Sequence, residues 1–480
     1  MQEVTRAFLY SNQVYSGLTE ASIHPQLIEI EGGRIRSTVS CSRSDLPTLL
    51  PHGAELTDVG NHLVTPAFVN GHTHLSMNVF RGIGLDAMAG NIVEDLYFHL
   101  EHDLSADDVR AFTRMGAYDC LLAGVGTVWD HYYHAEAVCL ALMDVGLTGV
   151  VAPTLQDIHG PGVQWLDAQW DSIGTIHENT TYAEHGIYAA FGPHATDTVS
   201  DELWRRVALA ASEFNIPIHA HVAQSVEEYD RSMELHGCSP IERLDRLDVL
   251  DAGSSALLVH GLFVSSADIS RLRPQRNILG YCPFSQVQFC FPAAVSQWVE
   301  AGIPIMVGTD SGACNDTMNV QQELRLMGGG SGYSIMTSTA GTDFLSAGTL
   351  PRARALEENR ATSLESRHGF STPCRLLDTV WSTPSQAHAH MKAGVLVEGA
   401  MANIAIWDLS HPAVWPANDP LRTIAMCDTK GALYGLMTNG IWRGELGRFA
   451  ASILESSEYR TAHAEADQRL SLLKERLRLT

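Results

Sequence analysis

Two histidines two residues apart, His72 and His74, are the first residues whose type and spacing suit chemistry. They end an apolar, strand-like run that begins at Pro66. Side chains alternate across a β-strand, so residues two apart point to the same side and their imidazoles can bind one metal ion together. The pair alone does not decide the matter, because a chain with 22 histidines can also hold such pairs at its surface or in its core.

Three further apolar runs end in a histidine or an aspartate, in the order Ile218-His219-Ala-His221, Leu257-Leu-Val-His260 and Ile305-Met-Val-Gly-Thr-Asp310. In a parallel α/β barrel the carboxyl ends of all eight strands meet at one mouth, where side chains from different strands form the active site. We therefore expect four strand ends to converge on one site.

In this order the motifs resemble the amidohydrolase superfamily, and more narrowly its cytosine deaminase, S-adenosylhomocysteine deaminase and triazine hydrolase branch. The resemblance runs from about Asn61 to about Leu446. It also includes Asn78-Val-Phe-Arg-Gly82, Gly126-Thr-Val-Trp-Asp130, Gly192-Pro-His194, and Gly394-Val-Leu-Val-Glu-Gly399 followed by Ala402-Asn403. It implies an α/β fold, a (β/α)8 TIM barrel, with a small β-sandwich beside it.

By resemblance and spacing, the metal ligands are assigned as His72, His74, His221 and Asp310. We expect one divalent ion, Zn(II), although Fe(II), Mn(II) and Co(II) accept similar donors. His219 shares a strand face with His221 and competes for the ligand role; we favour His221, because the resemblance places the ligand three residues before an acidic position, here Gln224. The alternative for His219 is a buried imidazole that is satisfied by hydrogen bonds and binds no metal.

A single ion is expected because the carboxylated lysine that bridges two metals in related enzymes has no counterpart. The fourth strand ends in Phe191-Gly-Pro-His194, and the three lysines, Lys392, Lys430 and Lys474, lie outside the predicted barrel strands.

Asp310 is expected to be the general base as well as a ligand, taking a proton from the attacking water and passing it to the leaving group. His260 is expected to orient the water and stabilise the oxyanion. A metal-bound water can have a pKa near 7, so hydroxide is available at neutral pH. These roles predict a hydrolase.

Gln224 departs from the pattern, because related deaminases carry a glutamate there that protonates a ring nitrogen. An amide donates a hydrogen bond but cannot transfer that proton. We therefore predict hydrolysis of a C–N bond in an amide, urea or carbamate, as in phenylurea or thiocarbamate hydrolases. The alternative is an aminohydrolase acting on an amino-substituted N-heterocycle. A catalytically silent protein on the same scaffold is a third, disfavoured class, because all four ligand positions are filled.

The substrate pocket is expected just beyond the strand ends. The run Phe284-Ser-Gln-Val-Gln288 is a second departure from the pattern of the family that the chain resembles, and it indicates that one wall of the substrate pocket differs. Aromatic and sulfur side chains favour a largely apolar substrate, although core packing explains each of them equally well. The predicted substrate-binding residues are Met77, Phe80, Trp129, His194, Phe284 and Asn315.

The elements that position this site follow from alternating strand-like and helix-like segments. Barrel strands are predicted to end near His74, Asp130, Leu155, His194, His221, His260, Pro283 and Asp310. Residues 1–65 and 395–450 contain short β-like runs that are predicted to pair into the sandwich, around a barrel at 66–394. Residues 451–480 are predicted as a C-terminal helix, and Gly328–Gly332 as a loop rather than a phosphate cradle.

A formal net charge of −24, from 31 basic and 55 acidic residues, disfavours nucleic acid and anionic membranes as partners. Nine scattered cysteines without a Cys-x-x-Cys pair indicate reduced thiols. With no signal sequence or apolar span in view, we expect a cytoplasmic enzyme with a small-molecule substrate. The resemblance implies a homo-oligomer.

Overall fold

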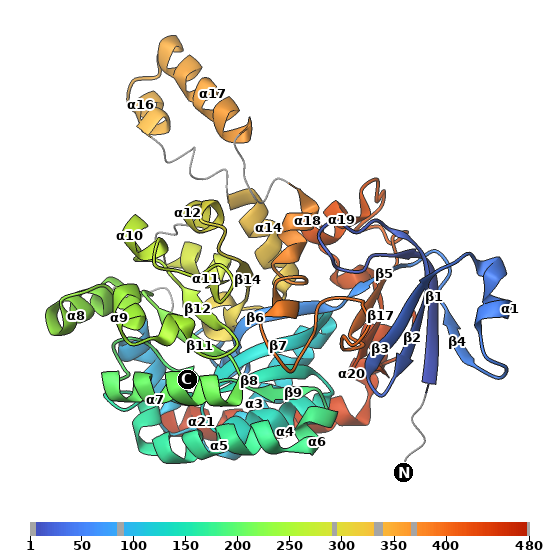
Figure 1. The fold of residues 1–480 in the computed structure, drawn as a ribbon, viewed down its shortest axis with the longest axis horizontal. Helices are drawn as coiled ribbons and strands as arrows, with labels where there is room; N and C mark the ends of the chain where they lie inside the picture. Colours follow the sequence, from blue (N-terminus) through green and yellow to red (C-terminus); the bar gives the residue numbers. More distant parts are fainter. Residues whose placement is uncertain (1–5, 84–90, 290–294, 331–338, 366–371, 478–480) are drawn as a thin grey trace.

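A computed structural model of the chain describes residues 6–83, 91–289, 295–330, 339–365 and 372–477 (Figure 1). Its centre is a TIM barrel, as the sequence predicts. The barrel strands are β6 (Phe68–His74), β7 (Val125–Tyr132), β8 (Thr148–Leu155), β9 (Ile187–Ala189) with β10 (Gly192–Pro193), β11 (Ile218–Val222), β12 (Ala256–His260), β13 (Asn277–Tyr281), and β14 (Ile305–Val307) with β15 (Asp310–Ser311).

Parallel pairing carries the strands around the barrel. β6, β7, β8 and β10 are hydrogen-bonded in that order, and β11 to β14 form the other arc. Ala195 pairs with His221 to join the arcs on one side, and β15 pairs with β6 through Asp310 and Thr73 on the other. The eighth strand therefore returns to the first, which brings Asp310 beside His74.

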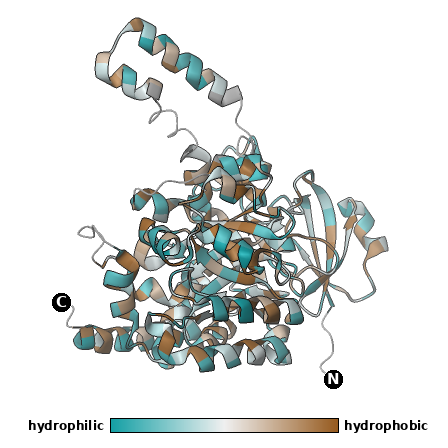
Figure 2. Ribbon diagram, turned by 60° about the vertical axis from the view of Figure 1, so that its left-hand side comes forward, coloured by the Kyte–Doolittle hydropathy of each residue, from teal (hydrophilic) through white to brown (hydrophobic). Residues whose placement is uncertain are grey.

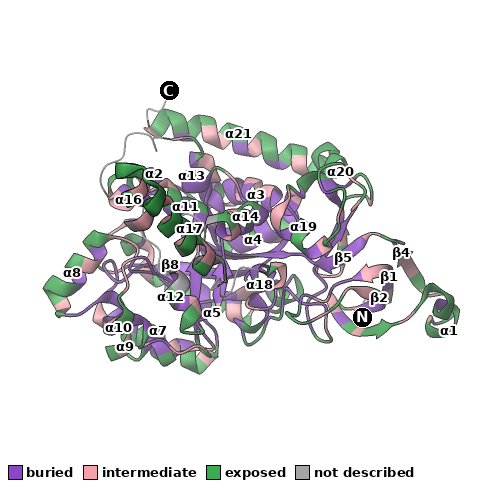
Figure 3. Ribbon diagram, turned by 90° about the horizontal axis from the view of Figure 1, so that it is seen from above, coloured by how far each residue is buried: buried purple, intermediate pink, exposed green. Residues whose placement is uncertain are grey.

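Helices surround the barrel and bury one face against it. Figure 3 shows buried strands inside and helices with exposed outer faces around them. α3 begins with a capping box, in which the Ser105 hydroxyl accepts from the Asp108 backbone and Asp108 accepts from Ser105. The helices of the barrel layer include α3 (Ala106–Leu122), α4 (Ala135–Val145), α5 (Leu166–Glu178), α6 (Thr180–Glu184), α7 (Asp201–Phe214), α8 (Val226–His236), α9 (Pro240–Arg246), α10 (Ser266–Ile269), α11 (Pro283–Gln288), α12 (Val295–Glu300), α13 (Gly312–Asn315) and α14 (Val320–Gly330).

The two chain ends meet in one sheet beside the barrel. Its order is β18-β17-β16-β5-β1-β2-β3, with β4 paired to β1, and β16 joins the two ends by pairing with β5 and β17. The boundaries predicted at 65, 394 and 450 stay predictions. The strands are β1 (Arg6–Val14), β2 (His24–Glu31), β3 (Arg34–Ser40), β4 (Glu55–Asp58), β5 (Leu63–Pro66), β16 (Ile404–Trp407), β17 (Leu433–Thr438) and β18 (Ile441–Arg443).

The segment after the barrel corrects one prediction. Gly328–Gly330 form the last residues of helix α14 rather than a loop, because the helical run Val320–Met327 continues through them; Ser331 and Gly332 lie outside the described residues. Helices α16 (Thr339–Ala347) and α17 (Leu350–Glu365) stand away from the body, with polar and apolar residues intermixed (Figures 1 and 2).

The chain ends in two helices, and two short helices come before them in the sequence. α18 (Pro373–Asp378) and α19 (Pro420–Met426) precede α20 (Phe449–Glu455) and α21 (Ser457–Leu477). Arg469 and Arg476 of α21 form ion pairs with Asp108 of α3. Leu473 is buried by this packing. Within the described ranges, no helix combines the length and apolar character that a membrane crossing requires.

Candidate active site

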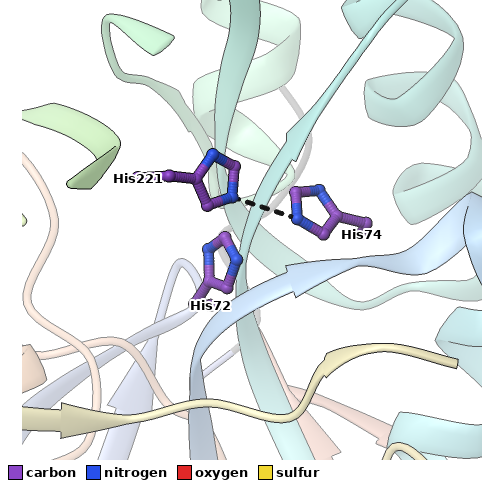
Figure 4. Close-up of side chains that lie close together, drawn as sticks. All are labelled: His72, His74 and His221. Carbon is purple, nitrogen blue, oxygen red and sulfur yellow. Dashed lines mark hydrogen bonds between the residues drawn. The ribbon is translucent and has the colours of Figure 1, made fainter. Parts of the chain in front are cut away.

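Three imidazoles from two strands meet at the carboxyl end of the barrel (Figure 4). His72 and His74 come from β6 and His221 comes from β11, and each offers a ring nitrogen within 4.8 Å of the others. The Nε2 atoms of His74 and His221 are 3.3 Å apart. The Nε2 atom of His72 is buried and has no hydrogen-bond partner among the described residues.

Each of these rings is fixed through its other nitrogen. The Nδ1 atom of His74 lies 2.5 Å from the carbonyl oxygen of His131, and that of His221 lies 2.9 Å from the carbonyl oxygen of His194. The Nδ1 atom of His72 lies 2.8 Å from Nε2 of His219. Protons on the three Nδ1 atoms leave the Nε2 lone pairs free to bind one cation. The donor set therefore fits a divalent metal ion.

His219 sits behind this group rather than in it. Its Nε2 atom is occupied by His72, and its ring is fully buried. Its alternation with His221 on β11 predicted a common strand face, but the structure separates their surroundings. Of the two readings of this pair, the geometry favours His221 as the candidate ligand.

Asp310 faces the imidazoles from β15. Its Oδ1 atom is 3.7 Å from Nε2 of His74 and 3.9 Å from Nε2 of His72. Oδ1 accepts a hydrogen bond from the Ser311 backbone at 2.8 Å, and Oδ2 accepts one from the Ser285 hydroxyl at 3.0 Å. These bonds fix the carboxylate at the position where a fourth ligand or a base is expected.

The backbone is strained at two of the strand ends. Asp310 has φ of +61° and His260 has φ of +76°. Residues other than glycine rarely adopt this left-handed region, and strain of this kind gathers at functional sites. The His260 ring stacks on the His221 ring, with centroids 5.4 Å apart, so His260 lies beside the candidate ligands.

Burial keeps the imidazoles neutral. It lowers the pKa of His74 below its usual value and that of His72 and His221 well below it. Burial also lowers the pKa of His194 to about 3. Neutral imidazoles are the form that binds metal. Burial has the opposite effect on the Cys282 thiol and raises its pKa well above the usual value.

A cavity of about 370 Å³ opens over these residues. Among the residues predicted from the sequence, its lining includes His74, His221, His260, Asp310, Gln224, His194 and Met77. The volume lies at the small end of the range for small-molecule sites. The predicted substrate-side residues His194 and Met77 are therefore brought to the same space as the candidate ligands.

Four predicted substrate-binding residues do not line this cavity. Phe80 is buried in the core, and Trp129 packs beside His219. Asn315 donates to the Thr309 carbonyl and to Glu323. Phe284, in the first turn of α11, is 40 % exposed. The cavity therefore does not support the prediction that these four residues contact the substrate.

The cavity also contains residues that the sequence reasoning did not single out. β7 runs two residues past its predicted end at Asp130, so that His131, Tyr132 and Tyr133 line the cavity in place of Trp129. Gln286 of α11 also lines it, and both its amide atoms are buried without hydrogen-bond partners among the described residues. One feature of the sequence pointed to Gln286, namely the unusual run after Pro283.

Glu101 is a further cavity residue that was not predicted. It is 5 % exposed and lies at the end of α2 (Phe98–Glu101). Burial raises its pKa to about 8. At neutral pH its carboxyl group is therefore mainly protonated and can donate a hydrogen bond.

Comparisons with known proteins agree with this geometry. A family model described as "Amidohydrolase family" matches residues 63–443. A 5-methylthioadenosine/S-adenosylhomocysteine deaminase of Pyrococcus furiosus is 25 % identical over 387 residues, which cover 80 % of this chain and 84 % of that one. A 5'-deoxyadenosine deaminase of Methanothrix thermoacetophila is 27 % identical over 303 residues, or 62 % of this chain and 68 % of that one.

Solved structures show the same fold. An adenosine deaminase from Xanthomonas campestris with bound zinc has a TM-score of 0.77 at 18 % identity, with 99 % of each chain covered. An atrazine chlorohydrolase from Arthrobacter aurescens TC1 complexed with zinc has a TM-score of 0.76 at 18 % identity, covering 96 % of this chain and 100 % of that one.

Proposed function

The chain belongs to the amidohydrolase family, and we propose that it is a zinc-dependent aminohydrolase that releases ammonia from an amino-substituted nitrogen heterocycle. That it is a metal-dependent hydrolase of C–N bonds follows from the family. The finer assignment is supported by similarity to deaminases of adenine nucleosides. It takes the place of the amide, urea or carbamate hydrolase predicted as the first choice from the sequence.

The observation that carries this proposal is the convergence, at the wall of the cavity, of one carboxylate and three neutral imidazoles whose Nε2 atoms are free to bind a cation. His72, His74, His221 and Asp310 are the proposed ligands of one ion. A zinc ion held there supplies an activated water and polarises the carbon that is attacked. No lysine lines the cavity among the described residues, which supports a single ion.

Asp310 is the proposed general base. Its carboxylate is oriented by Ser285 and Ser311, so it is placed to accept a proton from the attacking water and return it to the leaving amine. His260 lies in the same cavity and stacks on His221, where it can hydrogen-bond to the oxygen of the tetrahedral intermediate. His194 is the proposed substrate contact at the fourth strand.

Gln224 favours a second candidate, the hydrolysis of an amide, urea or carbamate. It lines the cavity where related deaminases carry an acid, and its amide can donate a hydrogen bond to a ring nitrogen without transferring a proton. An acyclic carbonyl needs no such protonation. The two candidates differ in the amine released, so product identity separates them.

The test is to load the purified protein with zinc and supply it with 5'-deoxyadenosine and 5-methylthioadenosine, and separately with phenylureas and carbamates. We expect ammonia from the heterocycles, about one zinc per chain by elemental analysis, and no turnover by Asp310→Asn. Release of aniline or an alkylamine from the ureas or carbamates alone overturns the proposal in favour of the second candidate. Two metals per chain contradict the single-ion site.

A further inference from the structure

A second group of charged side chains lies in the cavity beyond His194. The His194 ring is 5.0 Å from the His221 ring and 5.6 Å from the Phe98 ring, and Phe98 is 6.1 Å from the His159 ring. These ring contacts lead away from the candidate metal ligands. They end at Glu94, whose Oε1 atom is 2.9 Å from Nε2 of His159.

One arginine is shared by two carboxylates at this end of the cavity. The Nη1 atom of Arg231 in α8 is 3.2 Å from Oε1 of Glu94 and 3.5 Å from Oδ2 of Asp197. Glu94 belongs to a single π-helical turn, η4 (Val93–Tyr97), a rare conformation that occurs often at functional sites. Glu94 and Asp197 line the cavity, whereas Arg231 does not. The wall therefore presents more negative than positive charge to a ligand.

Asp197 lines the cavity and has a buried acceptor atom without a partner among the described residues. The residue is 9 % exposed and its Oδ1 atom has no hydrogen-bond partner among the described residues. A buried polar atom left without a partner destabilises the protein, and more so when the atom is charged. Because Asp197 lines the cavity, a ligand with an N–H group can supply the missing partner.

The rest of the lining matches a positively charged ligand. In the described part of the chain, no lysine or arginine lines the cavity, while Glu94, Asp197 and Glu227 do. Tyr97 and Phe98 stand beside them, and aromatic faces attract organic cations. A carboxylate or phosphate placed here meets the carboxylates of the lining, and the arginine beside them, Arg231, is already paired with Glu94 and Asp197.

We infer that this end of the cavity is a subsite for an organic cation, an ammonium, amidinium or guanidinium group carried by the substrate, with Asp197 as its anchor. The inference rests on the proposed function in one respect, that the reacting group of the same molecule lies at the metal ligands. Among amino-heterocycles, it favours molecules that carry a cation at the end remote from the scissile bond over neutral ones.

The test measures binding to the zinc-loaded protein by calorimetry, with 2-phenylethylammonium and the neutral 2-phenylethanol as matched probes. We expect Asp197→Asn to weaken binding of the ammonium about tenfold and to change binding of the alcohol less than twofold. Asp230→Asn is the control, because Asp230 is exposed on α8 beside Arg231 and does not line the cavity. It removes the same charge and should leave both affinities unchanged.

An equal loss for the two probes, or an equal effect of Asp197→Asn and Asp230→Asn, overturns the inference. If Asp197→Asn does not fold, Glu94→Gln provides the test, with a threefold or larger loss for the ammonium expected and no selective loss contradicting the subsite. Because probe binding and substrate turnover are measured separately, the two proposals can fail independently. Selective binding without hydrolysis of any candidate substrate counts against the proposed function alone, and hydrolysis without selective binding counts against the subsite alone.

Discussion

The Nδ1 atom of His72 lies 2.8 Å from the Nε2 atom of His219. For His72 to bind a metal through Nε2, its proton must be on Nδ1, so that His219 is the acceptor. Groups that hold a ligand imidazole in this way typically contribute 10- to 100-fold in metal affinity. His219 is therefore a positioning residue for the proposed ion.

We expect His219→Ala to weaken zinc binding about 10- to 100-fold, measured by competition with a chelator. His219→Gln should recover most of the affinity, because its amide oxygen can accept the same hydrogen bond. His388→Ala is the control, since His388 is buried beside Trp129 and does not line the cavity. It should lower stability without lowering zinc affinity; equal losses of affinity in the two alanine variants contradict the role of His219.

The sequence was sufficient to predict the barrel and the convergence of four strand ends. Apolar runs ending in His74, His221, His260 and Asp310 identify both the strands and their functional ends, because side-chain alternation and the shared barrel mouth follow from backbone geometry. The same reasoning could not separate His219 from His221 by direction alone. Their difference depends on contact with His72, which is 147 positions away in the chain.

The cavity wall was less predictable, because it depends on where each strand ends and how the following turn is oriented. The two extra residues of β7, His131 and Tyr132, line the cavity together with Tyr133, whereas Trp129 does not. The short helix α11 buries Gln286 and leaves Phe284 exposed. Shifts of one or two residues change the side chain that faces the substrate without altering the hydrophobic pattern.

Gln286 is expected to contact substrate through its unpartnered amide. A neutral hydrogen bond contributes about 0.5–1.5 kcal/mol, so Gln286→Ala should lower kcat/KM about 3- to 10-fold, measured by steady-state kinetics. Gln288→Ala, a change of the same residue type in the same helix outside the cavity lining, should leave kcat/KM unchanged. An identical loss in both variants would assign the effect to the helix as a whole.

Glu101 should make stability depend on pH. Burial raises its pKa from 4.5 to about 8, so between these values the unfolded chain loses a proton that the folded protein keeps. This group therefore lowers the free energy of unfolding by about 1.4 kcal/mol for each pH unit of rise across that window. Below pH 4.5 its contribution is constant.

Glu101→Gln removes this titration while keeping the shape of the side chain. In denaturant unfolding of the zinc-loaded proteins, we expect the stability of the variant relative to the parent to increase steadily from pH 5 to pH 8. Glu455→Gln, at an exposed surface site, is the control and should show a constant difference. A constant difference for Glu101→Gln as well would mean that its carboxyl ionises normally in the folded protein.

Gln224→Glu tests whether the reaction needs a proton donor at the end of β11. A general acid contributes about 10²- to 10⁴-fold in rate, and a glutamine supplies only its hydrogen bond. For the proposed aminohydrolase we expect Gln224→Glu to raise kcat for ammonia release from an amino-heterocycle by about 10²-fold, with a new basic limb in the pH profile as the acid ionises. Turnover of a urea or carbamate gains nothing from this acid. An unchanged rate with the heterocycle and an intact rate with the urea would assign the site to acyclic carbonyl substrates, for which Gln224 is the fitting residue.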